Sequence, residues 1–443
     1  MHERAAARRD IMKTAGISAA ALYLPRATCA QEHQQEMLLD QADDRIEKHR
    51  KSTIQLSVIG VDGTPLPPGT PVCIEQQQHA FLFGSKILKL NRPETAERDE
   101  ADGRLYAELF NFATLPFYWW KYEAEKGVPN DARSDASVQF CQQHGITAKG
   151  HPLAWNYMDP SWISDDPATA LQQQFERIEK CSERFKGRID CWDVVNEAAI
   201  FDREKCTNQA PVLTKAIQQM GLGNYLREAF KIARKANPQA TLIINDVRTG
   251  PSLEQRVLDE LTDENGRPLY DAIGLQSHMH RTLWPAEKIW EICERLGKYG
   301  RPIHFAETTL VSGPESEQGW NSTAAGEILQ AKRVEEFYRL LFSHPAVEAI
   351  SWWDFSDAGA WKNAPAGLVR KDQTPKPAYE ALKKLIHETW KTRMNTQISS
   401  DAPVPFRGFL GDYTVTAMLD GNKRAGTFKL DRSVKQARVV LSA

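Results

Sequence analysis

Cysteine is scarce in this sequence, with seven residues spread along a chain of 443. They are Cys29, Cys73, Cys141, Cys181, Cys191, Cys206 and Cys293. No two of them form a Cys-x-x-C pair and none stands in a tight cluster with histidine, so the sequence does not support a zinc site. We therefore expect no metal and no cofactor. Disulfide bonds are permitted outside the cytoplasm, but their pairing does not follow from the spacing.

The chain also lacks an excess of charge of one sign and a long apolar run. Its net charge is −2, which gives no argument for a nucleic-acid or membrane partner. The apolar stretch from Ala15 to Leu24 is too short for a stable bilayer anchor. It follows Arg8 and Arg9, and residues 1–30 look like a twin-arginine export signal, which predicts a periplasmic or extracellular protein. The alternative is a chance arginine pair on a disordered tail.

Apolar strands alternate with helical stretches from residue 80 onward. The strands expected are 81–84, 112–119, 146–153, 189–196, 241–245, 272–276, 302–306 and 349–353. Helices are expected between them, for example over 168–185, 222–236, 287–299 and 327–342. Eight repeats of strand and helix predict an α/β fold, a (β/α)8 TIM barrel over residues 80–392.

Two flanking segments have the period-two pattern of β-strands. We expect residues 31–51 to be a linker, 52–79 to supply about two strands and 404–443 about three. Neither set is expected to be stable alone, so we predict that they form one small accessory β-sandwich. Its core would be Val58, Val72, Ile74, Tyr413, Val415, Phe428 and Val440. We favour a structural clasp over a carbohydrate-binding module.

Two apolar strands end in a glutamate, Glu197 and Glu307. In barrels of parallel strands, the carboxyl ends of the strands carry the chemistry. Glycoside hydrolysis needs two carboxyl groups there, one to protonate the leaving oxygen and one to attack the anomeric carbon or activate water. The alternative for each glutamate is a salt bridge at the end of a strand.

Other strand ends carry side chains suited to sugar binding. They are His151, Trp155, Asn196, Gln276 and His278, with Trp353 and Trp361 around the last loop. Each has a structural alternative as a buried polar group or as core packing. Twelve tryptophans are a high count, and sugar-binding clefts use such flat apolar faces.

In combination these motifs resemble the family 10 glycoside hydrolases, the endo-1,4-β-xylanase family. The matching stretches are His151–Trp155, Trp192–Ala198, Ile243–Asp246, Ile273–His278, Phe305–Glu307 and Trp353–Trp361. The resemblance spans roughly residues 80–390 and implies a retaining mechanism. It implies Glu197 as acid/base, Glu307 as nucleophile and His278 as the residue that orients Glu307. It also implies sugar contacts for Asn196, Gln276, His151, Trp155, Trp353 and Trp361.

The sequence departs from that family after the second barrel strand. Pro116 and Phe117 stand where the family usually has Glu-Asn, and Asp354 stands where it usually has Gly. We therefore expect an altered glycone subsite in which Pro116, Phe117, Trp119 and Trp120 select the sugar by stacking. The alternative is that these aromatic residues only cap the barrel.

The expected partner is a polysaccharide, xylan or a related β-glycan, bound by a monomer. The alternatives are a barrel glycosidase acting on mannan or glucan, which the Gln276-x-His278 spacing disfavours, and a non-catalytic carbohydrate-binding protein.

Overall fold

The computed structural model describes residues 36–87, 96–399 and 403–442. The predicted export signal and Cys29 lie outside these residues. In the described part of the chain, none of the helices is both long enough and apolar enough to cross a membrane. Its cysteines are all free thiols, and Cys191 is buried.

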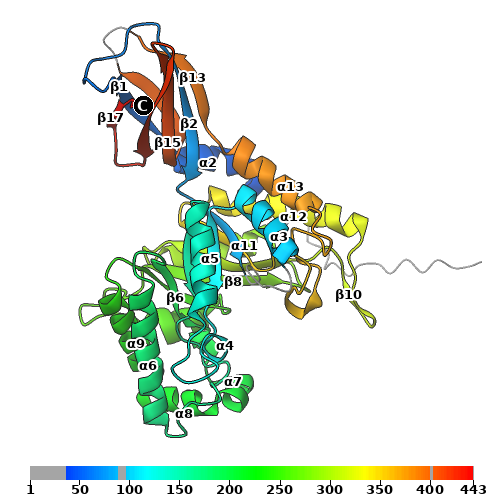
Figure 1. The fold of residues 1–443 in the computed structure, drawn as a ribbon. Coiled ribbons are helices and arrows are strands. Elements are labelled where there is room, and N and C mark those ends of the chain that lie inside the picture. Colours follow the sequence, from blue (N-terminus) through cyan, green and yellow to red (C-terminus); the bar gives the residue numbers. More distant parts are fainter. Residues whose placement is uncertain (1–35, 88–95, 400–402, 443) are drawn as a thin grey trace, which may run out of the picture.

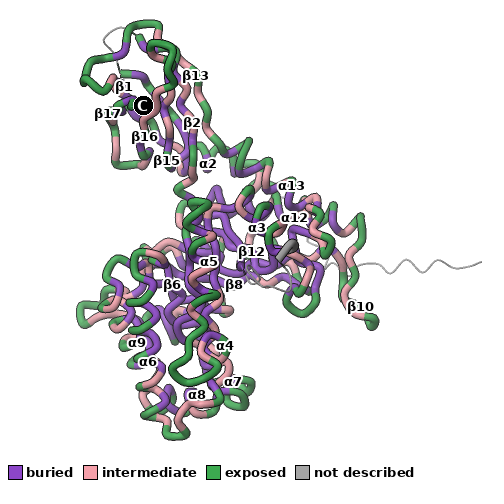
Figure 2. The backbone as a smooth tube through the Cα atoms, viewed as in Figure 1, coloured by how far each residue is buried: buried purple, intermediate pink, exposed green. Residues whose placement is uncertain are grey.

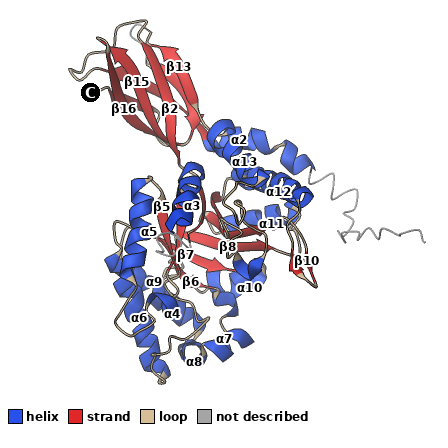
Figure 3. Ribbon diagram, turned by 45° about the vertical axis from the view of Figure 1, so that its right-hand side comes forward, coloured by secondary structure: helices blue, strands red, loops and turns tan. Residues whose placement is uncertain are grey.

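Eight parallel strands close into a barrel in the order β12-β3-β4-β5-β6-β7-β8-β9, which confirms the predicted fold class. The strands are β3 (Leu82–Lys86), β4 (Phe112–Pro116), β5 (Thr147–His151), β6 (Cys191–Asn196), β7 (Thr241–Asp246), β8 (Ala272–Met279), β9 (Ile303–Leu310) and β12 (Val347–Trp352). All eight overlap the strands expected from the sequence. Figure 3 shows them at the centre of the larger body, with helices around them.

Side-chain caps begin two of the helices that cover the barrel, α6 and α12. Asp166 accepts a hydrogen bond from the Thr169 N–H at the start of α6, and Pro167 occupies the first turn. The main helices are α3 (Ala96–Leu109), α5 (Asp131–Gln143), α6 (Pro167–Arg184), α8 (Pro211–Met220), α9 (Leu222–Ala236), α11 (Ala286–Gly297), α12 (Ala324–Ser343) and α13 (Pro377–Lys384). Short helices lie in the loops: α4 (Trp119–Tyr122), η2 (Ala198–Ile200), α7 (Glu204–Gln209), α10 (Pro251–Leu253), η3 (Glu254–Leu258), η4 (Trp361–Asn363) and η5 (Leu385–Thr389).

The two flanks form a β-sandwich of two sheets. One sheet has the order β14-β1-β17 and the other β13-β2-β15-β16. Their strands are β1 (Lys51–Ile59), β2 (Pro71–His79), β13 (Arg393–Gln397), β14 (Val404–Phe409), β15 (Gly411–Leu419), β16 (Asn422–Leu430) and β17 (Gln436–Val440). The buried side chains include all the predicted core residues except Val440, which is 47% exposed, while Val439 faces inward instead. This single-residue difference follows from the alternation of side chains along a strand.

In the described part of the predicted linker, residues 42–50 form a packed helix. In α2 (Ala42–Arg50), Ala42, Ile46 and Arg50 recur every four residues and are buried on one face. Arg50 donates hydrogen bonds to the carbonyls of Phe342, His344 and Val347 at 2.6, 2.6 and 2.7 Å. Since Val347 begins β12, this contact lies at the amino-terminal end of the barrel.

The sandwich therefore sits on the barrel face opposite the carboxyl ends of the strands, beyond α2 and α13 (Figure 1). The barrel and the sandwich have separate hydrophobic cores, and buried residues can be followed through each of them in Figure 2. Phe409 of β14 packs against Phe342, which also packs against Trp390. This position favours the structural role of the sandwich, because a substrate at the far mouth does not reach it.

Candidate active site

The two candidate glutamates lie at the carboxyl ends of β6 and β9. Glu307 falls within β9, and Glu197 directly follows β6. Glu197 has a left-handed backbone, with φ of 57° and ψ of 39°. That conformation is costly for a residue with a Cβ, and such residues concentrate at functional sites.

Glu307 is held as a carboxylate by donors on three strands. Asn245 Nδ2 donates to its Oε1 at 2.8 Å, His278 Nε2 lies 3.1 Å from its Oε2, and His151 Nε2 lies 3.7 Å from its Oε1. Burial alone would raise the pKa of Glu307. The hydrogen bond from His278 and the charges of the nearby His151, His278 and Lys149 together outweigh it, so the pKa lies below its usual value.

For Glu197, the effects that raise the pKa outweigh those that lower it. Burial raises its pKa, Arg203 opposes that effect with an ion pair, and the charge of Glu307 adds to it. The net pKa of Glu197 lies above the usual value. Two carboxyl groups whose surroundings move their pKa values apart are the arrangement that assigns one to acid catalysis and the other to attack.

Three side-chain amides connect the glutamates. Gln276 Nε2 donates to Glu197 Oε1 and to Asn196 Oδ1, both at 3.3 Å. Asn245 Nδ2 donates to the same Asn196 oxygen at 2.9 Å as well as to Glu307. The sequence prediction placed Asn196 and Gln276 here but gave Asn245 no role, although its position at the end of β7 was the signal that could have identified it.

A buried charge network lies beneath Glu307. Lys149 Nζ and His151 Nδ1 both contact Asp193 Oδ2, at 2.8 and 2.7 Å. Burial would raise the pKa of Asp193, but the charge of Lys149 and the hydrogen bond from His151 lower it below the usual value. Because Asp193 holds Nδ1 of His151, the ring presents Nε2 toward Glu307.

Aromatic side chains line both sides of the mouth. Tyr118, Trp120, Trp155 and Tyr157 pack on one another, and we call this group the aromatic shelf. The shelf begins beside the reaction site, since the Tyr118 and His151 rings lie 5.7 Å apart. On the other side, Trp353 and Trp361 lie 5.6 and 4.7 Å from the His278 ring, and Trp361 is 42% exposed.

Comparison with known proteins decides the family. The model of glycosyl hydrolase family 10 matches residues 96–385, about two thirds of the chain. The chain belongs to glycosyl hydrolase family 10.

The curated relatives of this chain are distant in sequence. Endo-1,4-beta-xylanase 1 of Arabidopsis thaliana is 27% identical over 405 residues, which cover 87% of this chain and 38% of that protein. Anti-sigma-I factor RsgI6 of Acetivibrio thermocellus is 26% identical over 403 residues, which cover 89% of this chain and 48% of the relative. The chain thus spans less than half the length of either relative.

Solved structures show the same family 10 fold. The crystal structure of xylanase 10B from Thermotoga petrophila RKU-1 in complex with xylobiose matches with a TM-score of 0.58 at 24% identity. The match covers 70% of this chain and 95% of that one, so the likeness concerns the barrel.

Phe117 is not part of the family 10 cleft in this chain, contrary to the sequence prediction. It is fully buried, with ring centroids 5.1 Å from Phe185 and 5.0 Å from Trp192. Trp192 itself packs behind Gly150, where a Cβ would meet its ring at 2.0 Å. Phe117 therefore packs behind the barrel wall, and Tyr118 takes its place at the mouth. Trp120 is in the aromatic shelf, as the prediction of a stacking role requires.

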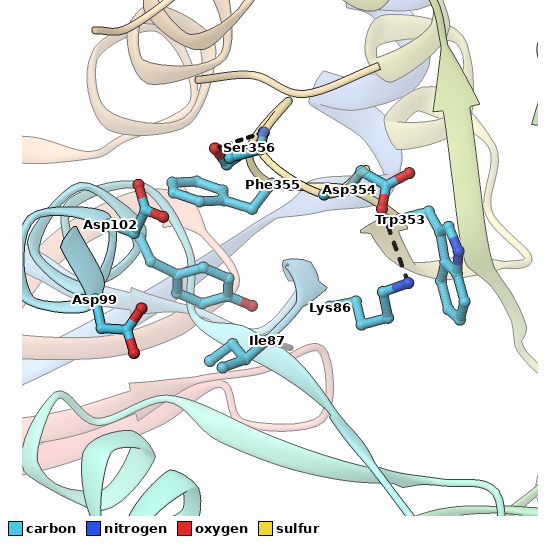
Figure 4. Close-up of a pocket in the computed structure, with 11 residues that line it drawn as sticks. Lys86, Ile87, Asp99, Asp102, Trp353, Asp354, Phe355 and Ser356 are labelled. Atoms are coloured by element: carbon cyan, nitrogen blue, oxygen red, sulfur yellow. Dashed lines mark hydrogen bonds and ion pairs between the residues drawn. The ribbon is translucent and has the colours of Figure 1, made fainter. Parts of the chain in front are cut away.

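The second departure from the family pattern, Asp354, forms an ion pair. Its Oδ1 lies 3.8 Å from Lys86 Nζ, and that ammonium lies 3.5 Å from the centre of the Trp353 ring. Figure 4 shows Lys86, Trp353 and Asp354 along one side of a pocket that Asp99 and Asp102 also line. Burial raises the pKa of Asp354, and Lys86 opposes it. The ion pair thus holds the Lys86 ammonium over the face of the Trp353 ring beside the site.

Asp246 fixes the backbone turn that follows Glu197. It accepts hydrogen bonds from the N–H groups of Ala199 and Arg248, both at 2.8 Å. Burial raises its pKa to about 7. Within the described ranges, no group of three or more His, Cys, Asp or Glu side chains could hold a metal ion.

The raised pKa of Asp246 predicts that stability falls as the pH rises from about 4 to about 7. Its folded pKa of about 7 lies above the ordinary 3.8, so its contribution is fully present below the ordinary pKa and is lost by the time the pH has risen through 7. The Asp246→Asn variant keeps an oxygen acceptor at this position and cannot ionise. We expect the melting temperature of the wild type, relative to that of the variant, to fall from about pH 4 to about pH 7 and to change no further above that range. Equal slopes in scanning calorimetry would refute this.

Proposed function

We propose that the protein is a retaining glycoside hydrolase that cleaves β-1,4-xylosidic bonds in xylan or a related plant polysaccharide. The observation that carries the proposal is the single hydrogen-bond network that joins Glu197 and Glu307 through Gln276, Asn196 and Asn245. Membership of family 10 supports it. A retaining enzyme has its carboxyl groups about 5–5.5 Å apart, and that separation is a prediction for this pair.

In the proposed first step, Glu307 attacks the anomeric carbon while Glu197 gives a proton to the leaving oxygen. The lowered pKa of Glu307 keeps it ionised for attack, and the raised pKa of Glu197 keeps it protonated to a higher pH. In the second step, Glu197 takes a proton from water, which then attacks the glycosyl-enzyme and releases the sugar. Asn245, His278 and His151 hold Glu307 in position for both steps.

Xylan is the proposed substrate because several relatives are named endo-1,4-beta-xylanases, including one from Thermotoga neapolitana that is 26% identical over 339 residues. The aromatic shelf would supply stacking on the glycone side, where Glu-Asn is missing from the sequence. Mannan or glucan is the alternative substrate. A non-catalytic binding protein is the alternative of another class, and the retained carboxyl pair argues against it.

Release of reducing sugar from a panel of xylans, mannans and glucans tests the proposal. Activity on xylan that exceeds activity on the others is the expected result. Binding without release of sugar from any of the polysaccharides would favour the non-catalytic alternative. A preference for mannan or glucan would show that this polysaccharide, and not xylan, is the substrate.

The role of Glu197 predicts a dependence on the leaving group. A Glu197→Ala variant should lose about 10²- to 10⁴-fold in kcat/KM on xylan, which needs protonation of the departing oxygen. The loss should be much smaller on an aryl xylobioside with a nitrophenolate leaving group. Comparing kcat/KM on both substrates is the measurement, and equal losses on the two would contradict the acid role.

Export through the twin-arginine route is proposed on the Arg8-Arg9 motif and the apolar residues after it. Replacing both arginines by lysine should retain the protein inside the cell. Unchanged export of that variant would contradict the proposal. Light scattering of the purified protein checks the expected monomer.

A further inference from the structure

Both carboxylate oxygens of Glu197 accept hydrogen bonds from groups that can only donate at that point. Gln276 Nε2 donates to Oε1 at 3.3 Å, and the Arg203 guanidinium pairs with Oε2. A guanidinium has no acceptor and stays protonated. Because both partners donate and neither can accept, this arrangement favours the ionised form of Glu197 over the protonated form.

Acid catalysis requires a proton on Glu197, and withdrawal of one donor would favour that form. Gln276 is a poor candidate, because it is 3% exposed, lies on β8 and also bonds Asn196. The Arg203 side chain is 30% exposed and lies on the loop between η2 and α7. Arg203 is therefore the donor that can move into solvent.

We propose that Arg203 is a positioning residue that pairs with Glu197 Oε2 in the free enzyme and withdraws when the leaving-group sugar binds, which favours the protonated form of Glu197. The inference rests on the proposed function, because it assumes that Glu197 is the acid/base. The same contact, restored after the leaving group departs, favours the ionised form that activates water in the second step. Arg203 thus links the protonation state of Glu197 to occupancy of the leaving-group side.

The other titratable groups that face Glu197 do not replace this effect. They are Glu307, Asp246, Tyr118 and Cys206. Burial raises the pKa values of Tyr118 and Cys206, which keeps both neutral, and Asp246 with its pKa of about 7 is mostly neutral in acid solution. Glu307 is anionic and disfavours a second carboxylate. Arg203 is therefore the group whose charge most lowers the pKa of Glu197.

The test compares pH profiles of Arg203→Gln, Arg203→Lys and wild type. The profile of kcat/KM reports the free enzyme and that of kcat the substrate complex. Without the cation the pKa of Glu197 rises, so the basic limb of kcat/KM should move to higher pH in Arg203→Gln. At pH values above the basic limb of the wild type, kcat/KM of Arg203→Gln, expressed relative to its own optimum, should exceed that of the wild type roughly threefold to tenfold. Lysine should restore most of the wild-type profile.

The basic limb of kcat should stay in place, because Arg203 has withdrawn in the complex. Arg256 offers a matched control, since it donates to the Ala199 carbonyl at 2.8 Å and pairs with Asp202 at 2.9 Å without contacting Glu197. An Arg256→Gln variant should leave both limbs unchanged. An unmoved kcat/KM limb in Arg203→Gln, or an equal shift in the control, would overturn the proposal, and so would an equal shift of the kcat limb.

A second measurement separates this inference from the proposed function. The Glu197 carboxyl carbon, assigned by its loss in Glu197→Gln, can be titrated by ¹³C NMR in wild type and in Arg203→Gln. We expect a higher pKa in the variant, and equal values would overturn the inference whatever the activity. A wild type that hydrolyses no glycan would instead remove the proposed function.

Discussion

A Glu307→Gln variant is expected to lose at least about 10⁴-fold in kcat on any substrate that the wild type cleaves. The amide has almost the shape of the carboxylate, but it is a far weaker nucleophile for the anomeric carbon. Asn245 and His278 remain in place to hold the side chain, so the sugar should still bind. Stopped and continuous assays give kcat, and calorimetry with a xylo-oligosaccharide gives the affinity.

Glu294→Gln is the matched control for that variant. Glu294 is an exposed glutamate that contacts His344 at 3.0 Å and takes no part in the network around Glu307. Its replacement should leave kcat unchanged. If Glu307→Gln kept a rate within tenfold of wild type, another group would be the nucleophile.

Deletion of residues 404–443 is expected to destroy the stability of the whole chain. It removes β14 to β17 and exposes the inner faces of β1 and β2. Phe406, Tyr413, Val415 and Leu430 are among the buried side chains lost, each contributing about 1.5–3 kcal/mol when buried. Their sum is comparable with the stability of a typical protein, about 5–15 kcal/mol. We expect aggregation, or a greatly lowered melting temperature, in soluble expression and calorimetry.

Two point variants on β15 provide a finer form of the deletion test. Val415 is fully buried and Met418 is exposed on the same strand. Val415→Asp should lower the melting temperature strongly and Met418→Asp should not, while any folded fraction keeps its activity on short soluble substrates. A truncated chain with wild-type melting temperature and solubility would show that the flanks share no core.

The barrel was predictable because each of its strands is an apolar run bounded by polar or turn residues. The accessory sandwich was less so. Pro405 argued against a strand, yet β14 is an edge strand, where a missing N–H is tolerated. In β13, exposed and half-buried residues alternate, which gives no apolar signal. The segment of α2 is polar and helix-prone in the sequence, but its packing was missed because its buried face includes Arg50, whose charge conceals that packing.

The site was predictable where a motif fixes the end of a strand. His278 contacts Glu307, as the family resemblance implied. Gln276 contacts Glu197, whereas the resemblance implied a contact with the sugar and the nucleophile. Phe117 was misplaced because it lies just past β4, where the direction of a side chain depends on local backbone geometry. Arg203 was missed because its contact depends on the left-handed turn at Glu197, which brings a later loop residue back onto the carboxylate.

The most direct test of the central claim is mass spectrometry of the protein after reaction with an activated 2-deoxy-2-fluoro-β-xylobioside. In a double displacement, the 2-fluorine slows both steps and the good leaving group restores the rate of the first, so the glycosyl-enzyme accumulates. We expect one fluoroxylobiosyl group on the peptide that carries Glu307, and no label on the Glu307→Gln variant. A label on another carboxylate would contradict it, as would release of the inverted anomer without any label.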